Sequence, residues 1–262
     1  MKSTIFNISV SLVISTFVFS SCKKVIDIDL NDSNPQFVIE ANIINDGTPC
    51  TVDITKTINF SESNNFPAVT NAIVTLSDNA GNSENLQMTS NGHYTSSTIT
   101  GVQGRTYTLN VNVDGKTFNA VSTLPYEVNL DSAWVQDLLI FGSNSYSVIP
   151  EYKDSSGTMN FYRFKLFVND TLDKNIFLED DVFTDGRTVT IPLFGEIEIE
   201  AGDTLRLQMM CIDKPAYLFF FSLASLQNGS TGAPANPVSN FSGGCLGYFS
   251  AHTLMEKTMV VF

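Results

Sequence analysis

The fold class is decided by residues 106–123, TYTLNVNVDGKTFNAVST. Tyr107, Leu109 and Val111 alternate with polar residues, which is the period-two pattern of a strand that has one face in a core. Asp114-Gly115 follows, and these residue types tolerate the positive φ angles of a tight hairpin turn. The residues up to Thr123 then continue as a second strand. The stretch therefore predicts a β-hairpin with one buried face.

Similar short runs, separated by turn signals, precede this hairpin in the sequence. Asp46-Gly47, Ala80-Gly81-Asn82 and Asn91-Gly92 lie between runs where hairpins need turn formers. Strands at this spacing predict an immunoglobulin-like or transthyretin-like β-sandwich over residues 37–124, with Leu124-Pro125 at its end. The predicted strands upstream of the hairpin are Phe37–Asn45, Thr51–Ile58, Ala72–Ser77, Glu84–Thr89 and Tyr94–Ile99.

Beyond Pro125 the runs become longer and more aromatic, which predicts a second, larger β-sandwich over residues 125–262. In the run that starts at Phe161, the side chains of Tyr162, Phe164, Leu166 and Val168 share one face. The predicted strands are Ser132–Phe141, Tyr146–Tyr152, Phe161–Asn169, Asn175–Phe183, Thr188–Leu193, Thr204–Ile212, Cys245–Ala251 and Thr258–Phe262.

One helix is predicted inside this second region. Pro215 suits its first turn, Leu218–Gln227 forms its body and Gly229 follows its end. We expect the helix to cover an open end of the second sandwich. The predicted fold class is thus all-β, with two sandwich domains and one short helix.

Composition supports this class and excludes some functions. Charged residues make up only 16% of the 262-residue chain, below the usual value of roughly 25%, and Ser, Thr and Asn replace them on the expected solvent faces. The net charge of −13 argues against nucleic-acid binding, which needs clustered Lys and Arg. It also argues against attachment to anionic lipids through a basic patch.

The first residues resemble a lipoprotein leader. Lys2 gives a positive start, Ile5–Phe19 is an apolar stretch of about 15 residues, which suits a signal peptide better than a membrane span, and Ser20-Ser21 precedes Cys22. Small residues directly before a Cys are typical of lipoprotein processing. We predict that residues 1–21 are removed and that acyl chains such as palmitate anchor Cys22 to the membrane. Residues 22–36 are predicted to be a lipidated tether or, alternatively, a first edge strand.

The remaining cysteines and the two histidines give no metal pattern. Cys50, Cys211 and Cys245 form no CxxC pair, and only His93 and His252 could join them. No zinc site is predicted. The sequence leaves open whether Cys211 and Cys245 form a disulfide or remain buried free thiols. His93, next to a turn and without an apparent carboxylate partner, is predicted to be solvated rather than a catalytic base.

Two acidic segments are the visible candidates for chemistry. In a strand, Glu196, Glu198 and Glu200 would share one face, as paired carboxylates of a hydrolase do, but a solvated strand face explains them equally well. Glu179-Asp180-Asp181 with Asp185-Gly186 could collect a hard cation, yet the spacing of a calcium loop is missing. We interpret this segment as an acidic surface turn, and we predict no metal site.

No catalytic or cofactor motif stands out in the rest of the chain. The Gly-x-Ser-x-Gly elbow, the His-Glu-x-x-His helix and the phosphate loop are all missing from the sequence. Trp134, Tyr217 and Phe219–Phe221 could stack on a sugar or a peptide, but sandwich cores need such residues too. The sequence therefore predicts a protein that is not an enzyme, with no cofactor and no catalytic residues.

Many segments of the mature chain resemble the lipoproteins grouped under domain of unknown function 4249. The segments that carry the resemblance are Ser21-Cys22-Lys23-Lys24, Phe37–Ile43, Asn71–Val74 with Asp78–Gly81, Gly101–Val111, Asn160–Arg163, Gly202-Asp203 with Tyr217, and Asn236–Val238 leading to Gly243–Ala251. The resemblance implies two β-domains and a lipid on Cys22. It also implies an outer-membrane protein encoded beside TonB-dependent receptors.

The leading hypothesis is therefore a non-enzymatic binding or accessory lipoprotein of a TonB-dependent nutrient uptake system. Its partners would be the membrane, through the lipid, and the receptor; its ligand could be a small molecule, a glycan or a peptide. The sequence leaves open whether it faces the periplasm or the cell surface. The alternatives are an adhesive or structural surface protein, and a glycan or peptide hydrolase that uses Glu196–Glu200.

We predict that protein isolated from its native host lacks residues 1–21 and carries acyl chains on Cys22. Intact-mass measurement checks this prediction, with Cys22→Ser as the unlipidated control. The variant should leave the membrane fraction because its acyl anchor is lost. An unmodified thiol at Cys22, or a retained leader, would contradict the prediction.

Overall fold

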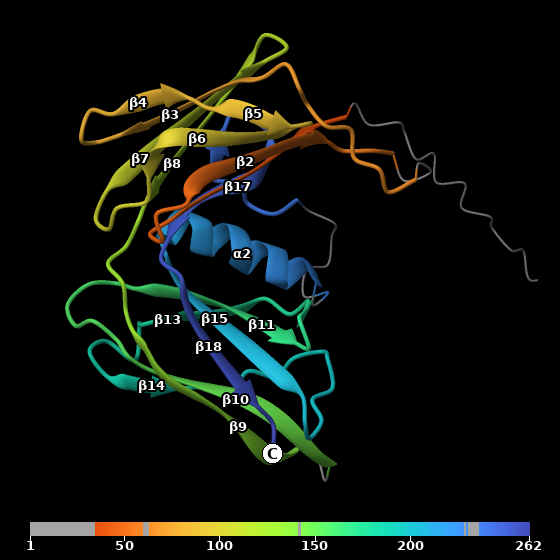
Figure 1. Cartoon of the computed structure of the whole chain (residues 1–262), viewed down its shortest axis with the longest axis vertical. Helices are drawn as coiled ribbons and strands as arrows, with labels where there is room; N and C mark the ends of the chain where they lie inside the picture. Colours follow the sequence, from red (N-terminus) through yellow and green to blue (C-terminus); the bar gives the residue numbers. More distant parts are fainter. Residues whose placement is uncertain (1–34, 60–62, 141–142, 228, 230–235) are drawn as a thin grey trace, which may run out of the picture. The chain divides into compact units, whose positions relative to one another are not determined.

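The computed structural model describes residues 35–59, 63–140, 143–227, 229 and 236–262. Strands make up most of these residues, so the all-β fold class is confirmed (Figure 1). The predicted leader, Cys22 and most of the predicted tether lie outside the described residues. In the described part of the chain, no helix is long and apolar enough to cross a membrane.

The first sandwich consists of two sheets that enclose one core. Its first sheet has the order β17 (Leu246–His252), β1 (Phe37–Ile44), β2 (Pro49–Lys56), β6 (His93–Thr100) and β5 (Gln87–Ser90). Its second sheet has the order β16 (Phe241–Ser242), β8 (Lys116–Thr123), β7 (Thr106–Val113), β3 (Ile73–Asp78) and β4 (Ser83–Asn85).

The hairpin predicted from residues 106–123 is confirmed. Strands β7 and β8 pair over their whole length, and the inward side chains Tyr107, Leu109 and Val111 have no exposed surface. Asp114 and Gly115 have φ angles of 49° and 73°. Positive φ at both central residues is what a type I′ turn requires. The local pattern therefore determines both the register and the turn.

One predicted strand, Glu84–Thr89, is wrong as a single element. The chain breaks at Leu86, so that β4 pairs with β3 in one sheet and β5 pairs with β6 in the other. Leu86 is buried between them, and its N–H donates to the carbonyl oxygen of Val74. Crossing between the sheets lets this apolar side chain enter the core, which a straight edge strand would not allow.

The second sandwich also has two sheets around a separate core. The inward positions of β11 are those predicted, since Tyr162, Phe164, Leu166 and Val168 are buried. Its first sheet has the order β14 (Thr188–Thr190), β10 (Ser143–Lys153) and β9 (Leu130–Ile140). Its second sheet has the order β12 (Thr171–Leu172), β11 (Phe161–Val168), β15 (Thr204–Ile212) and β18 (Met255–Val260), with β13 (Phe177–Asp180) also paired to β11.

The predicted helix is confirmed as α2 (Lys214–Gln227), but its expected position is wrong. It does not cover an open end of the sandwich. Its buried residues Phe219 and Phe220 share a cluster with Met210 and Ile212, which alternate along β15 with the core residues Met209 and Cys211. The helix therefore packs on the sheet face opposite the core, between this sheet and Tyr248 of β17 (Figure 1).

The chain returns to the first sandwich near its end. Strand β17 pairs in parallel with β1, from Val38 opposite Leu246 to Ile44 opposite His252, and β16 pairs with β8. These strands lie within residues 125–262, which the sequence assigned to the second sandwich. Residues 35–262 accordingly behave as one compact unit. The division of the chain at residue 124 stays a prediction, but it does not account for these two strands.

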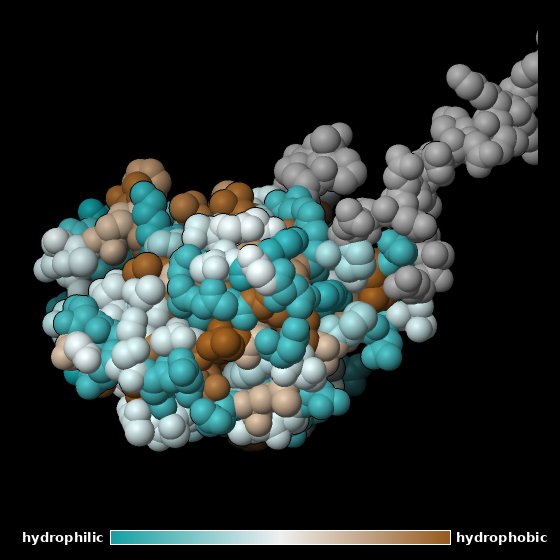
Figure 2. Space-filling model, turned by 90° about the horizontal axis from the view of Figure 1, so that it is seen from above, coloured by the Kyte–Doolittle hydropathy of each residue, from teal (hydrophilic) through white to brown (hydrophobic). Residues whose placement is uncertain are grey.

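The surface of the strands is mostly uncharged and polar. Outward positions of β7 carry residues such as Thr108 and Asn112, as the composition suggested. Figure 2 shows a face that is largely hydrophilic or near neutral in hydropathy, with hydrophobic residues in small separate groups. Strand faces of this kind remain soluble without many charged side chains.

We predict that Gly247→Ala strongly destabilises the protein. Gly247 has a φ of 97°, and a Cβ there would overlap the backbone of Ile39 in the neighbouring strand. We expect a loss of about 3 kcal/mol or more in the free energy of unfolding, because steric overlap adds to backbone strain. Urea denaturation followed by circular dichroism measures it.

The matched control is Gly244→Ala. Gly244 has a similar φ of 83°, but no atom lies within 4 Å of the added Cβ, so only the strain of roughly 1–2 kcal/mol is expected. Equal losses in the two variants would mean that close approach of β1 and β17 does not limit this position.

Candidate functional site

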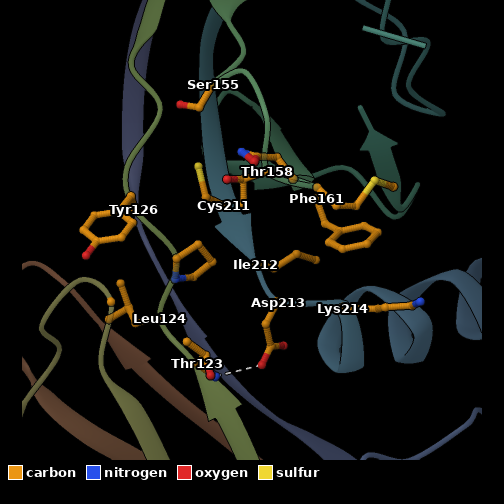
Figure 3. A pocket seen from close by; sticks show the side chains of 14 residues that line it. Thr123, Leu124, Tyr126, Ser155, Thr158, Phe161, Cys211, Ile212, Asp213 and Lys214 are labelled. Atoms are coloured by element: carbon orange, nitrogen blue, oxygen red, sulfur yellow. Dashed lines mark hydrogen bonds between the residues drawn. The ribbon is translucent and has the colours of Figure 1, made fainter. Parts of the chain in front are cut away.

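A cavity of about 810 Å³ lies where the two sandwiches meet (Figure 3). Its volume is within the range of roughly 300–1,000 Å³ that is usual for small-molecule sites, which often occur at domain junctions. Its lining residues are Gly104, Thr123, Leu124, Pro125, Tyr126, Ser155, Thr158, Met159, Asn160, Phe161, Cys211, Ile212, Asp213 and Lys214.

Three connections build the wall of this cavity. The linker Leu124–Tyr126 runs from β8 towards β9, and the loop Ser155–Asn160 joins β10 to β11. The third is the junction at Asp213, where β15 ends and α2 begins. Each connection is flanked by regular strands or by α2. These elements therefore position the walls of the cavity.

The lining of the cavity is mainly apolar, with hydroxyl groups, a thiol and two residues of opposite charge, Asp213 and Lys214. Phe161 and Ile212 give apolar walls, while the hydroxyl groups of Ser155 and Thr158 come from one loop (Figure 3). Cys211 contributes a thiol, and burial raises its pKa, so it is uncharged at neutral pH. A lining of this kind suits a neutral ligand that offers both apolar surface and hydrogen-bonding groups.

Hydrogen bonds to Asp213 connect the elements that form the cavity wall. One of its carboxylate oxygens accepts a hydrogen bond from the N–H of Ala216 at 3.0 Å, which caps α2. The other accepts from the N–H of Thr123 at 2.9 Å and from the hydroxyl of Ser122 at 2.8 Å. The Ser122 hydroxyl in turn accepts from the N–H of Ala251 in β17. Burial raises the pKa of Asp213, and these hydrogen bonds oppose the rise.

The glutamates considered for a hydrolase lie on the surface. The segment Glu196–Glu200 is not a strand, although Glu196, Glu198 and Glu200 still alternate with the inward Ile197 and Ile199. All three carboxylates are exposed. They line neither of the two described pockets.

The fold brings two residues of the acidic turn close to a third carboxylate. Asp181 and Asp185 lie together with Asp154, which comes from the end of β10. Asp180 points elsewhere and accepts a hydrogen bond from the hydroxyl of Tyr217 at 3.2 Å. Sequence spacing could not reveal Asp154, because it is 27 residues from Asp181 along the chain.

The three cysteines of the described region are free and buried. Cys50 and Cys245 belong to the core of the first sandwich and Cys211 to that of the second, so the open choice between a disulfide and free thiols resolves in favour of thiols. Burial raises the pKa of Cys50 and of Cys245 to about 12.

The two histidines differ from each other. His93 does have a carboxylate partner, since its Nδ1 lies 2.6 Å from Oδ1 of Asp53 in the neighbouring strand, and its predicted isolation is wrong. His252 is buried, and burial together with the nearby cations of Arg163 and Lys165 lowers its pKa to about 4.

The candidate aromatic residues divide between the core and the surface. Phe219 and Phe220 are buried, as the core interpretation predicted. Trp134 is partly exposed, and Phe221 is exposed but stacks on Tyr217. None of them lines the cavity, whose aromatic residues are Tyr126 and Phe161. No sequence motif marks these two residues, because only the packing of the two sandwiches brings them together.

The fold and the cavity define an all-β protein of two sandwiches with a small-molecule-sized site between them. Residues 23–258 match the family model for domain of unknown function DUF4249. The chain therefore belongs to this family, and the predicted family membership is confirmed. None of the curated proteins compared with it matches.

We predict that Asp213→Ala destabilises the fold by about 2–4 kcal/mol, because it removes a helix cap and leaves buried donors without an acceptor. Urea unfolding, followed by circular dichroism and by the fluorescence of Trp134, measures the loss. Asp131→Ala removes the same charge from an exposed position and should change the stability by less than about 0.5 kcal/mol. Similar values for both variants would show that Asp213 does not hold the junction.

Proposed function

We propose that this chain is a lipid-anchored outer-membrane protein that assists TonB-dependent uptake by binding a solute in the cavity between its two sandwiches. In this role it binds and releases the solute without catalysing a reaction. Its partners are the membrane, reached through the acyl chains on Cys22, and a TonB-dependent receptor.

Location and partner are supported by the leader sequence and by the family resemblance. Ser21-Cys22 follows an apolar stretch that suits a cleaved signal peptide. The resemblance implies receptors encoded nearby. The acidic net charge of −13 disfavours adsorption to anionic lipid, which makes a covalent anchor the consistent means of attachment.

The observation that carries the binding role is the cavity itself. It is of small-molecule size, and the ends of strands and a helix hold its walls. Its lining is mostly apolar and hydroxyl-bearing, with one carboxylate, Asp213, and one cation, Lys214. Such a lining, without a cluster of like charges, favours an uncharged small molecule, glycan or peptide over a phosphorylated or strongly charged ligand. The visible carboxylate series Glu196–Glu200 lies outside it, so the cavity lacks the paired acids of a glycan hydrolase.

The test uses the tagged full-length chain expressed in its native host. Intact cells are crosslinked, the chain is purified, and mass spectrometry identifies bound proteins and extracted solutes. We expect a TonB-dependent receptor and a copurifying solute. Thr158→Trp should reduce the solute at least about tenfold, which corresponds to about 1.4 kcal/mol of lost binding energy, because the indole fills the cavity. Receptor recovery should not change.

The matched control is Thr171→Trp, at an exposed position in β12, which should retain the solute. Equal solute recovery from the two variants would exclude the cavity as the binding site. If no outer-membrane transporter is crosslinked from intact cells, the uptake role loses its support, and an adhesive or structural role becomes the better explanation.

A further inference from the structure

Three carboxylates converge beside the cavity, and two of them are buried. One oxygen from each of Asp154, Asp181 and Asp185 lies within 4.8 Å of the others. Asp154 and Asp181 expose only 3% and 2% of their surface, whereas Asp185 is exposed. None of the ion pairs found among the described residues includes any of the three.

The neighbouring hydrogen bonds orient these carboxylates without neutralising them. Asp154 accepts from the hydroxyl of Tyr162 and from the N–H of Gly186. Asp185 accepts from the N–H of Gly157 at 2.7 Å. All three donors are neutral, so the negative charges remain close together in a buried place, which is costly without a cation.

Asp181 shows this cost most clearly. Burial raises its pKa, and the carboxylates of Asp154 and Asp185 raise it further, while hydrogen bonds from the backbone N–H groups of Asn160 and of Asp181 itself oppose the rise. A bound cation would reverse this balance, because its charge favours the ionised form.

A second and independent feature lies on the same face. Strands β11 and β13 pair with Phe161 opposite Asp180, and one step further the N–H of Asp181 donates to the carbonyl oxygen of Asn160. Asn160 thus lies opposite Asp181, and residues opposite each other in an antiparallel pair share a face. Tyr162, two residues further on, points to Asp154 from that face.

The side-chain oxygen of Asn160 has no partner there. Its Oδ1 is buried and accepts no hydrogen bond, although buried carbonyl oxygens are almost always paired. This oxygen is closed to water, but an ion smaller than a water molecule would meet its need for a positive charge. Two observations, the unneutralised carboxylates and the unpaired amide oxygen, thus point to the same kind of ligand.

We propose that Asp154, Asp181, Asp185 and the Oδ1 of Asn160 bind a hard divalent cation of the Ca²⁺ class. All four ligands are carboxylate or carbonyl oxygens, which Ca²⁺ prefers, and no Cys or His belongs to the cluster, as zinc or copper would favour. Water at the exposed side of Asp185 completes the coordination. Mg²⁺ fits less well because it demands near-octahedral geometry at shorter distances.

The cation site is independent of the proposed function but touches the same cavity. Ser155 and Asn160 begin and end the loop that forms one cavity wall, and Asp154 precedes this loop directly. A cation that crosslinks Asp154 to Asp181 and Asp185 would hold this loop against the β13–β14 connection.

The test is calorimetric titration of Ca²⁺ into the chelator-stripped full-length chain in detergent, combined with thermal melting with and without Ca²⁺. We expect one site per chain and a rise in Tm of roughly 3 °C or more at saturation. Mg²⁺ should bind at least about tenfold more weakly. Asp181→Asn should weaken Ca²⁺ binding at least about tenfold, because it removes a charged ligand.

Without Ca²⁺, the Tm of Asp181→Asn should be no lower than that of wild type, because the substitution relieves repulsion between the carboxylates. If the Asp181 carboxylate only stabilised the fold, its replacement would lower the Tm with and without Ca²⁺. Asp131→Asn, which changes an exposed Asp in β9, should behave as wild type. The proposal is overturned if Ca²⁺ neither binds nor raises the Tm of wild type, or if Asp181→Asn and Asp131→Asn bind it equally. Should Asp181→Asn fail to fold, Asp185→Asn at the exposed side decides by the same comparison.

Discussion

The parallel pairing of β1 with β17 is the constraint on which the rest of the architecture depends. Residues 37–44 enter the first sandwich at the start of the described chain, and their neighbour in the sheet arrives only at residues 246–252. Between these points the chain builds α2 and all strands of the second sandwich except β18. The core of the first sandwich includes Phe249 and Ala251 from the returning strand, so this core is complete only when the chain has passed through the second sandwich and returned.

This return also explains where the cavity and α2 lie. The chain crosses between the sandwiches near Leu124–Tyr126 and again after α2, and the junction of β15 with α2 faces the first crossing. Asp213 accepts hydrogen bonds from both sides of this junction, from the N–H of Thr123 at the end of β8 and from the N–H of Ala216 in the first turn of α2.

Much of the local structure could be predicted from the sequence, because it depends on neighbours along the chain. Strands β7, β8 and β15 have the predicted bounds, since strict alternation and an Asp-Gly turn specify them. The break at Leu86 was missed because a single inward side chain, and not a Gly or Pro, marks it. The segment Glu196–Glu200 kept its alternation but had no strand to pair with, and alternation alone does not make a sheet.

The candidate site is harder to predict from the sequence, because none of its residues belongs to a recognisable motif. Tyr126 and Phe161 have no motif, and they become wall residues only through the packing of two sandwiches. Asp154 meets Asp181 through the pairing of β11 with β13 and the hydrogen bond that the Tyr162 hydroxyl donates to Asp154. Such contacts join residues far apart in sequence, and no spacing rule in a single sequence records them.

The burial of Cys50, Cys211 and Cys245 has a consequence for the lifetime of the protein. A thiol reacts with oxidants and with other disulfides as the thiolate, and burial suppresses this form in each of the three. The folded chain thus presents no reactive thiol among its described residues, and these cysteines can persist as free thiols in an oxidising compartment. The unfolded chain loses this protection, so oxidation selectively removes the molecules that have failed to fold.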